Sequence, residues 1–420
     1  MPASSELRGP IARWSRHRIE LRWFRMRAMR IAFYAPLKSP EHEIPSGDRR
    51  VARLLIQALE RAGHQVTLAS NFRSLDIAGR PDAQRVLRDA GTALAEQLAA
   101  KWLASAPAAR PELWFSYHVY YKAPDWLGPR VSSALGIPYV ISEASHAPKR
   151  ANGPWAIGHE ATTEAIRAAS LLFSPTRDDI ACLESIVSAP ATIRFLPPFL
   201  DVSPYLAALQ NRIHIRERLA TRYGLDRSVP WIVVAAMMRP GDKLSSYRML
   251  ARVVGRLDDL GWLLVVAGDG IARPEVETAF RHVGQQRVCF VGERAEGELA
   301  AIYAACDLCV WPAINEAYGM AMLEAQAAGV PVVSQALRGV PDVVCDGRTG
   351  LLSAGGDDEG LSRLVRTLLS DESRCRELGR NAAAFVSAER SVDAAAAKLA
   401  TAIAGLNVPG TGHSAAEGGA

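Results

Sequence analysis

The stretch from Trp311 to Val333 constrains the fold of this chain more than any other part of the sequence. An apolar run that begins at Leu308 leads into a polar loop, and the loop is followed by an alanine-rich segment that stops at Gly329. A second apolar run begins at Val330. This order predicts a strand, a loop, a helix and a second strand, which is the repeating unit of α/β folds.

Two carboxylates flank the loop of this stretch. Glu316 lies in the loop and Glu324 in the second predicted turn of the helix, which gives the spacing E-x7-E. The residues between them offer backbone amides at a helix start, where unpaired N–H donors and the positive end of the dipole suit a diphosphate. Glu324 could then accept both hydrogens of a ribose diol, and Glu316 could hold sugar hydroxyls. In the alternative interpretation, both glutamates only complement the helix dipole and face solvent.

Two cations follow another strongly β-branched run, residues 231–236. Arg239 lies in the loop after it and Lys243 in the first turn of the next helix, with a glycine between them. A later run ends in Gly268-Asp269-Gly270, but Arg273 stands where a G-x-G-x-x-G fingerprint needs its third glycine. The sequence therefore gives little support to a dinucleotide-dependent dehydrogenase.

The first half of the chain contains a similar unit. A predicted strand at 31–35 is followed by a polar loop with Gly47 and by a predicted helix over 49–61. Arg49 and Arg50 stand at the start of this helix, where the dipole disfavours cations by up to about 1 kcal/mol. We therefore favour a phosphate or an acidic acceptor near them; solvent exposure, with pairing to Asp48, is the alternative.

Two histidines lie near the tips of predicted strands in the first half. His118 ends the run 113–118, and His146 follows the run 138–142. Lys149 and Arg150 come shortly afterwards. Because ligands of open α/β sheets bind at the carboxyl ends of the strands, all four are candidate ligand contacts. The alternative is that they are structural or solvated residues.

The stretch 311–333 and the segment after it, S-Q-A-L-R-G-V-P-D-V-V-C-D-G-R-T-G-L-L, resemble the signature of retaining glycosyltransferases of family 4, the glycosyl transferases group 1. The likeness covers most of residues 29–400 and is strongest in 231–352. It implies the GT-B fold, in which two Rossmann-like α/β domains face each other across a cleft. Asp342 replaces the usual glutamate of this segment, and Gly47 stands alone where the family often has two glycines.

The resemblance also assigns roles to residues. Glu316 and His146 are the catalytic candidates that it implies. Residues implied to bind the donor are Arg239, Lys243, Gly319, Met320, Ala321, Glu324, Gly47 and Gly268. Candidates for the acceptor or a phosphate are Arg49, Arg50, His118, Lys149 and Arg150.

The function implied is a retaining hexosyltransferase in polysaccharide biosynthesis. It would move a sugar from a UDP-, GDP- or ADP-sugar to a hydroxyl of a glycan or a lipid-linked acceptor, with no cofactor. The chain has no D-x-D motif, so we expect no metal site, and no nucleic-acid partner is expected. Two alternatives remain: a sugar-nucleotide epimerase with the same nucleotide pocket, and a non-catalytic sugar-binding protein.

The length of 420 residues favours two domains. Two adjacent prolines, Pro197 and Pro198, can continue neither a helix nor a strand, and we place the domain boundary just after them. The expected segments are a basic extension (1–28), an acceptor domain (29–200), a nucleotide-sugar-binding domain (201–388), a helix that crosses back (389–405) and a disordered tail (406–420).

The net charge of +5 belongs to the extension 1–28, which holds seven arginines and two glutamates. As a helix it could lie on an anionic membrane surface; a start at Met29 or a disordered arm is the alternative. No apolar run approaches the roughly 18 residues of a membrane span. Six cysteines scattered through apolar segments fit a reducing cytoplasm better than a disulfide framework. We therefore expect a cytoplasmic protein, with peripheral membrane contact as a second expectation.

Overall fold

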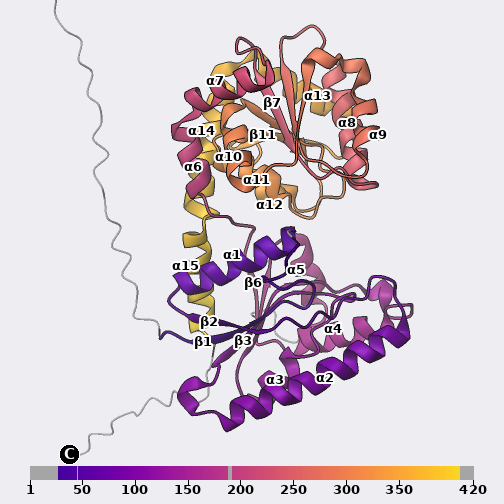
Figure 1. The fold of residues 1–420 in the computed structure, drawn as a ribbon, viewed down its shortest axis with the longest axis vertical. Helices are drawn as coiled ribbons and strands as arrows, with labels where there is room; N and C mark the ends of the chain where they lie inside the picture. The colour runs from indigo at the N-terminus through magenta and orange to yellow at the C-terminus, as the bar shows by residue number, and fades with distance from the viewer. Residues whose placement is uncertain (1–26, 45, 188–191, 407–420) are drawn as a thin grey trace, which may run out of the picture.

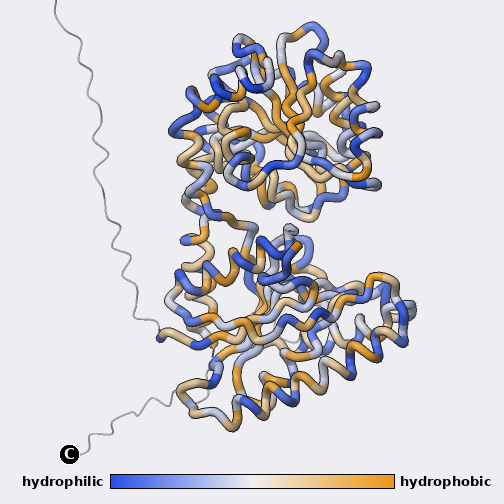
Figure 2. The backbone as a smooth tube through the Cα atoms, in the orientation of Figure 1, coloured by the Kyte–Doolittle hydropathy of each residue, from blue (hydrophilic) through white to orange (hydrophobic). Residues whose placement is uncertain are grey.

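The computed structural model describes residues 27–44, 46–187 and 192–406. They form two domains, and each is built around a parallel sheet of six strands with helices on both faces (Figure 1). The predicted α/β class with two Rossmann-like domains is confirmed. Figure 2 shows apolar strands at the centre of the second domain, as expected for strands buried on both faces.

The sheet of the first domain has the strand order β2-β1-β3-β4-β5-β6. The strands are β1 (Arg30–Tyr34), β2 (Gln65–Ser70), β3 (Leu113–Val119), β4 (Tyr139–Ala144), β5 (Leu171–Ser174) and β6 (Ile193–Phe195). The direction in which strands are added reverses between β1 and β3. In open parallel sheets, such a reversal opens a crevice at the carboxyl ends of the two strands, where ligands bind.

Helices cover both faces of the first sheet. They include α1 (Gly47–Arg61), α2 (Pro81–Ala104), α3 (Gly128–Leu135), α4 (Ala156–Ala168) and α5 (Arg177–Glu184). Helix α1 begins where the hydroxyl of Ser46 accepts a hydrogen bond from the amide of Arg49. Its buried face, which includes Leu54, Leu55 and Leu59, packs on β1 and β3. This packing holds the start of α1 beside the carboxyl edge of the sheet.

The second sheet has the order β12-β11-β10-β7-β8-β9, which is the strand order of the Rossmann fold. Its strands are β7 (Trp231–Ala235), β8 (Leu263–Ala267), β9 (Val288–Gly292), β10 (Leu308–Val310), β11 (Val332–Gln335) and β12 (Gly350–Ser353). Its helices are α6 (Ser203–Gln210), α7 (Arg212–Tyr223), α8 (Asp242–Gly255), α9 (Arg273–Ala279), α10 (Glu296–Ala305), α11 (Met320–Ala327), α12 (Val340–Val343), α13 (Asp358–Ser370) and α14 (Glu372–Glu389). Here the reversal lies between β7 and β10.

The chain passes between the domains twice, at neighbouring points. It leaves the first domain after β6, and it returns after α14 into α15 (Val392–Ala404), which lies against α1 (Figure 1). The amide of Leu200 donates to the carbonyl of Arg390 (3.0 Å), and the amide of Val392 donates to the carbonyl of Leu200 (3.1 Å). The two connections are thus hydrogen-bonded to each other.

Most of the predicted extension 1–28 and almost all of the predicted tail 406–420 lie outside the described residues. The predicted membrane contact of the extension therefore stays a prediction. Within 27–44, 46–187 and 192–406, no helix combines the length and the apolarity that crossing a bilayer requires.

Candidate functional site

A pocket of about 280 Å³ lies at the carboxyl ends of β7 and β10, where the second sheet reverses. The loop after each strand supplies one side of it. Its lining consists of Arg239, Pro240, Asp242, Lys243, Ile314, Asn315 and Glu316. The structure thus brings together three predicted residues: Arg239 from the loop after β7, Lys243 from the first turn of α8, and Glu316 from the loop after β10.

An ion pair organises the floor of this pocket. The Nζ atom of Lys243 donates to Oε2 of Glu316. The same carboxylate oxygen lies 3.4 Å from Nε1 of Trp311, and the ammonium lies 5.4 Å from the centre of a Trp311 ring. Both charged side chains are more than three-quarters buried, which weakens screening by water and fixes the positions of both charges.

A third cation, which the sequence analysis did not select, lies beside the pocket. Arg338 donates through Nη1 to Oδ1 of Asn315 (2.5 Å), and Asn315 donates through Nδ2 to Oδ2 of Asp242 (2.9 Å). Asn315 and Arg338 both have left-handed backbone conformations, with φ of 53° and 49°. Such conformations are uncommon outside glycine and concentrate at functional sites. In the sequence, the cue to Asn315 as a site residue was that it directly precedes Glu316.

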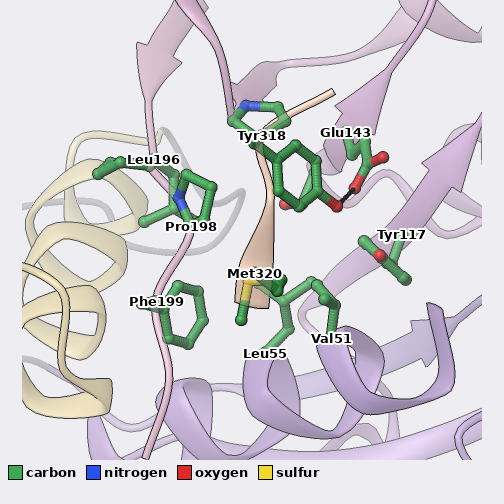
Figure 3. Close-up of a pocket in the computed structure, with 12 residues that line it drawn as sticks. Val51, Leu55, Tyr117, Glu143, Leu196, Pro198, Phe199, Tyr318 and Met320 are labelled. Atoms are coloured by element: carbon green, nitrogen blue, oxygen red, sulfur yellow. Dashed lines mark hydrogen bonds between the residues drawn. The ribbon is translucent and has the colours of Figure 1, made fainter. Parts of the chain in front are cut away.

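Helix α11 begins next to Glu316, as the sequence predicts. Gly319 precedes it with a φ of 71°, and a Cβ atom there would come within 2.2 Å of the Met322 side chain. Met320 and Ala321 occupy the first two helical positions, and no side chain caps this end of α11. The amide of Met322 donates to the carbonyl of Gly319 (3.0 Å), so the amides of Met320 and Ala321 are the ones left to solvent or a ligand. The side chain of Met320 points into a second pocket between the domains (Figure 3).

Glu324 lies in α11 with only 4% of its surface exposed, so the alternative of a solvated face is wrong for this residue. Its carboxylate accepts a hydrogen bond from Nη1 of Arg50, which belongs to α1 of the first domain. Nη2 of Arg50 donates to Oε1 of Glu296 (2.7 Å) and to the hydroxyl of Tyr205 (3.1 Å). Burial raises the pKa of Glu324, and the guanidinium opposes that increase.

The contacts of Arg50 change its predicted role. It was expected to attract a phosphate or an acidic acceptor, but in this structure its charge is balanced by two carboxylates of the second domain. Arg49, its neighbour, donates instead to the carbonyl of Glu43 (3.1 Å). Only Arg50 of this pair therefore joins the two domains.

His118 is held at the carboxyl edge of the first sheet. Its Nδ1 atom lies 2.9 Å from Oδ1 of Asp48 and 3.6 Å from Oε1 of Glu143. Oε2 of Glu143 accepts a hydrogen bond from the hydroxyl of Tyr318, a residue of the second domain (3.3 Å). Burial lowers the pKa of His118, but the carboxylates of Glu143 and Asp48 raise it more. Burial raises the pKa of Glu143.

The sequence analysis did not select Asp48 or Glu143 as site residues. Glu143 is the fifth residue of β4, and its side chain reaches the sheet edge because the backbone there is left-handed, with a φ of 63°. The resemblance pointed to His146 at this strand exit. His146 lies beyond the end of β4, its ring centre is 5.1 Å from that of His159, and it lines neither of the two pockets described above.

Two further candidates lie apart from these pockets. Lys149 is exposed in a short helical turn, Pro148–Arg150. The guanidinium carbon of Arg150 lies 5.4 Å from the ring centre of Tyr121 and 5.0 Å from that of Trp155. Arg150 is therefore positioned by aromatic stacking.

The two predicted glycines outside α11 differ in what their backbones require. Gly47 is the first residue of α1, and a Cβ atom added to it would meet nothing within 4 Å. The conformation of this turn therefore does not demand glycine. Gly268, by contrast, has a φ of 137°, and a Cβ atom there would lie 2.0 Å from the carbonyl oxygen of Ala236. Gly268 allows the ends of β7 and β8 to approach each other.

Comparison with known proteins identifies the family of the second domain. Residues 246–385 match the family described as glycosyl transferases group 1, the same group that the sequence resembles. The D-inositol 3-phosphate glycosyltransferase of Corynebacterium glutamicum is 30% identical over 175 residues, which cover 40% of this chain and 42% of that relative. That of Stackebrandtia nassauensis is 31% identical over 205 residues, 46% of this chain and 44% of the relative. The chain thus matches less than half the length of these relatives.

Solved structures extend the likeness to both domains. The structure of Anabaena Alr3699/HepE in complex with UDP and glucose superposes on this chain with a TM-score of 0.62, at 16% sequence identity. The superposition covers 90% of this chain and 100% of the Anabaena chain. WaaG, a glycosyltransferase involved in lipopolysaccharide biosynthesis, superposes with a TM-score of 0.60 at 18% identity. This superposition covers 90% of this chain and 100% of the WaaG chain. At these identities the comparison establishes the GT-B fold.

Proposed function

We propose that this chain, whose residues 246–385 belong to the glycosyl transferases group 1, transfers a sugar from a nucleoside-diphosphate donor to an acceptor hydroxyl with retention of configuration. The observation that carries the proposal is the convergence of Arg239, Lys243 and Glu316 in one pocket at the reversal of a sheet with Rossmann order. Cations and a carboxylate at that point suit a ligand with a diphosphate next to sugar hydroxyls.

In this proposal the second domain holds the donor. Arg239, Lys243 and the first amides of α11 contact the diphosphate, Glu316 accepts hydrogen bonds from the sugar, and Glu324 accepts them from the ribose. In the structure Glu316 is paired with Lys243, and Glu324 with Arg50. Donor binding must therefore exchange part of each ion pair for hydrogen bonds to the donor.

The proposed reaction exchanges one bond to the anomeric carbon for another. The bond from that carbon to the phosphate oxygen breaks, and the acceptor oxygen attacks from the same face. The acceptor proton passes to the departing diphosphate. The cations of the pocket offset the negative charge that develops on this leaving group, and such preorganised charges are commonly the largest single contribution to catalysis. We therefore expect full activity in EDTA.

The comparisons support the choice of donor and reaction class. Several relatives are named D-inositol 3-phosphate glycosyltransferases, and one structural neighbour was crystallised with UDP and glucose. The proposed acceptor is a glycan or a lipid-linked saccharide, and peripheral contact with a membrane remains part of the proposal.

The test uses the full chain with a panel of UDP-, GDP- and ADP-sugars. Release of nucleoside diphosphate is measured with and without a glycan extract or a membrane extract, in the presence and absence of EDTA. Release that requires an extract supports transfer, and NMR of the product then reports the anomeric configuration. Isomerised donor without an extract would indicate an epimerase, and binding without turnover would indicate a sugar-binding protein.

A further inference from the structure

We propose that Asn315 and Arg338 are positioning residues for Glu316, and that Arg177 of the first domain holds in place the loop that carries Arg338. Contact between the domains thereby acts on the carboxylate that binds the donor sugar. This inference rests on the proposed function and deepens it, because the role of Glu316 toward the sugar belongs to that proposal. It gives the first domain an influence on donor binding through residues that do not touch the donor.

The loop that carries Glu316 is fastened to helix α8 at three successive residues. The contacts are the amide of Ile314 with Oγ of Ser246 (3.0 Å), Nδ2 of Asn315 with Oδ2 of Asp242 (2.9 Å), and Oε2 of Glu316 with Nζ of Lys243. All three partners belong to the beginning of α8, and Ser246 is 1% exposed. Because the three loop residues are consecutive, the direction of the Glu316 side chain depends on the two contacts that precede it.

Arg338 determines how the amide of Asn315 is oriented. The end of an asparagine side chain carries a donor on one side and an acceptor on the other. Oδ1 of Asn315 accepts from Nη1 of Arg338 (2.5 Å), so that Nδ2 faces Asp242. Asn315 and Arg338 both have left-handed backbones, which persist only where surrounding contacts hold them. Loss of the Arg338 side chain should therefore release Asn315 and, with it, the neighbouring Glu316.

The loop that carries Arg338 is a tight turn between β11 and α12. Three backbone hydrogen bonds close it, from Leu337 to Gln335 (2.8 Å), from Val340 to Leu337 (3.0 Å) and from Asp342 to Gly339 (3.1 Å). The turn also lies against the loop of Glu316, because a Cβ atom at Gly339 would be 2.0 Å from the carbonyl oxygen of Ala317. Arg338 and Asp342 therefore belong to one closely bonded unit, and a shift of one displaces the other.

The first domain contacts the opposite end of this turn. Asp342 is 7% exposed, and its Oδ2 atom accepts from the backbone amide of Arg177 (3.0 Å), while its Oδ1 atom accepts from Nη1 of the same residue. Arg177 is the first residue of α5, so the carboxylate also stands at the positive end of that helix. The methyl group of Thr176 would lie 3.0 Å from a Cβ atom at Gly339. Residues 335–342 thus span from the first domain to Asn315.

The test compares two affinities of the full chain by calorimetry, one for UDP, GDP and ADP and one for the corresponding glucose nucleotides. Arg338→Gln should weaken binding of the glucose nucleotide about tenfold and change binding of the nucleotide less than about twofold, because the sugar contact of Glu316 is what it disturbs. Arg338→Lys keeps a donor for Asn315 and should restore most of the affinity. Arg376→Gln, which removes an exposed arginine of α14, is the matched control.

The contribution of the first domain is measured with Arg177→Gln. It should weaken binding of the glucose nucleotide about threefold, whereas Arg85→Gln, at an exposed arginine of α2, should leave it unchanged. The double variant of Arg177 and Arg338 should bind like Arg338→Gln alone, because both replacements act through the same turn. Glycine adopts the left-handed backbone of Arg338 without strain. Arg338→Gly should therefore unfold at no lower temperature than the wild type and still lose the affinity.

Three results would overturn the inference. They are equal binding by Arg338→Gln and Arg376→Gln, an equal loss of nucleotide and glucose nucleotide in Arg338→Gln, and losses for Arg177→Gln and Arg338→Gln that multiply in the double variant. Glu316→Gln tests the proposed function separately, because unchanged binding of the glucose nucleotide in that variant contradicts the role assigned to Glu316. A loss in Glu316→Gln without one in Arg338→Gln contradicts only this inference.

Discussion

The carboxyl edges of the two sheets follow the same topological rule but differ in charge. At the second edge, Arg239, Lys243 and Arg338 gather around Glu316. At the first edge, Asp48 and Glu143 surround His118. The comparison teaches that the reversal in strand order determines where a ligand binds, whereas the side chains at the strand ends determine which part of the ligand is bound.

The two edges also differ in how open they are. The second has a pocket of about 280 Å³, while the pocket at the first measures about 30 Å³ and is closed by Tyr318. The pocket at the second edge is therefore open while the domains keep their present arrangement. The first edge becomes accessible to a larger ligand only when the domains move apart.

Replacement of Lys243 should give the largest effect, because it removes a cation from the second edge. We expect Lys243→Ala to lower kcat/KM about a hundredfold through loss of charge stabilisation on the leaving diphosphate. The matched control is Arg248→Ala, which removes an exposed cation from the same helix, α8. Steady-state kinetics with the best donor provides the measurement, and equal activity of the two variants would contradict the role assigned to Lys243.

Glu324→Gln should weaken nucleotide binding about tenfold to a hundredfold. The carboxylate is buried, and charge-assisted hydrogen bonds to a ribose diol would be lost. Isothermal calorimetry with UDP, GDP and ADP measures this effect against Glu298→Gln, an exposed glutamate of α10. Equal affinities in the two variants would show that Glu324 serves only the contact with Arg50.

Arg50→Ala tests the ion pair that connects the two domains, because the direction in which it changes the nucleotide affinity distinguishes two roles for Arg50. Because Arg50 occupies the carboxylate that the ribose would use, its removal should strengthen nucleotide binding, by about fivefold. In the Glu324→Gln background the same replacement should change the affinity little, and Arg49→Ala serves as the neighbouring control. Weaker binding by Arg50→Ala would indicate that this cation contacts a phosphate of the nucleotide, and a phosphate is one of the two ligands that the sequence favoured.

His118→Gln should have the smallest effect, on stability rather than on nucleotide binding. The pKa of His118 is raised from its ordinary value of 6.5. Its stabilising contribution is therefore complete below 6.5 and is lost as the pH rises through the folded-state pKa. Urea unfolding should show a loss of about 1 kcal/mol at mildly acidic pH and a smaller loss in alkaline buffer. A loss that grows with pH would contradict the contacts of His118 with Asp48 and Glu143.

Local patterns in the sequence predicted much of the second edge. The segment from Trp311 to Val333 has one strand-loop-helix-strand pattern, and Glu316 and Glu324 lie within it. Arg239 and Lys243 follow one strand closely. Where one short segment supplies both the strands and helix and the polar side chains, the hydrophobic periodicity of the sequence and the spacing of its charged residues suffice to locate the candidate site.

The first edge could not be predicted in the same way, because its residues come from separate elements. Asp48, His118 and Glu143 belong to α1, β3 and β4, and no sequence pattern relates them. The choice of His146 over Glu143 came from an uncertain register at the exit of β4, where a left-handed residue turns the chain. Arg50 lies 274 positions from Glu324, so their pairing depends on how the domains meet.

The return of α15 to the first domain has a consequence for biosynthesis. Its residues Val392, Ala395, Leu399 and Ile403 complete the same apolar core as α1 and β1. During translation, the ribosome releases this helix only after the whole intervening domain has been made. The amino-terminal half therefore keeps part of its core uncovered until the second domain and α15 have been made, and termination before α15 would leave that half exposed to proteases.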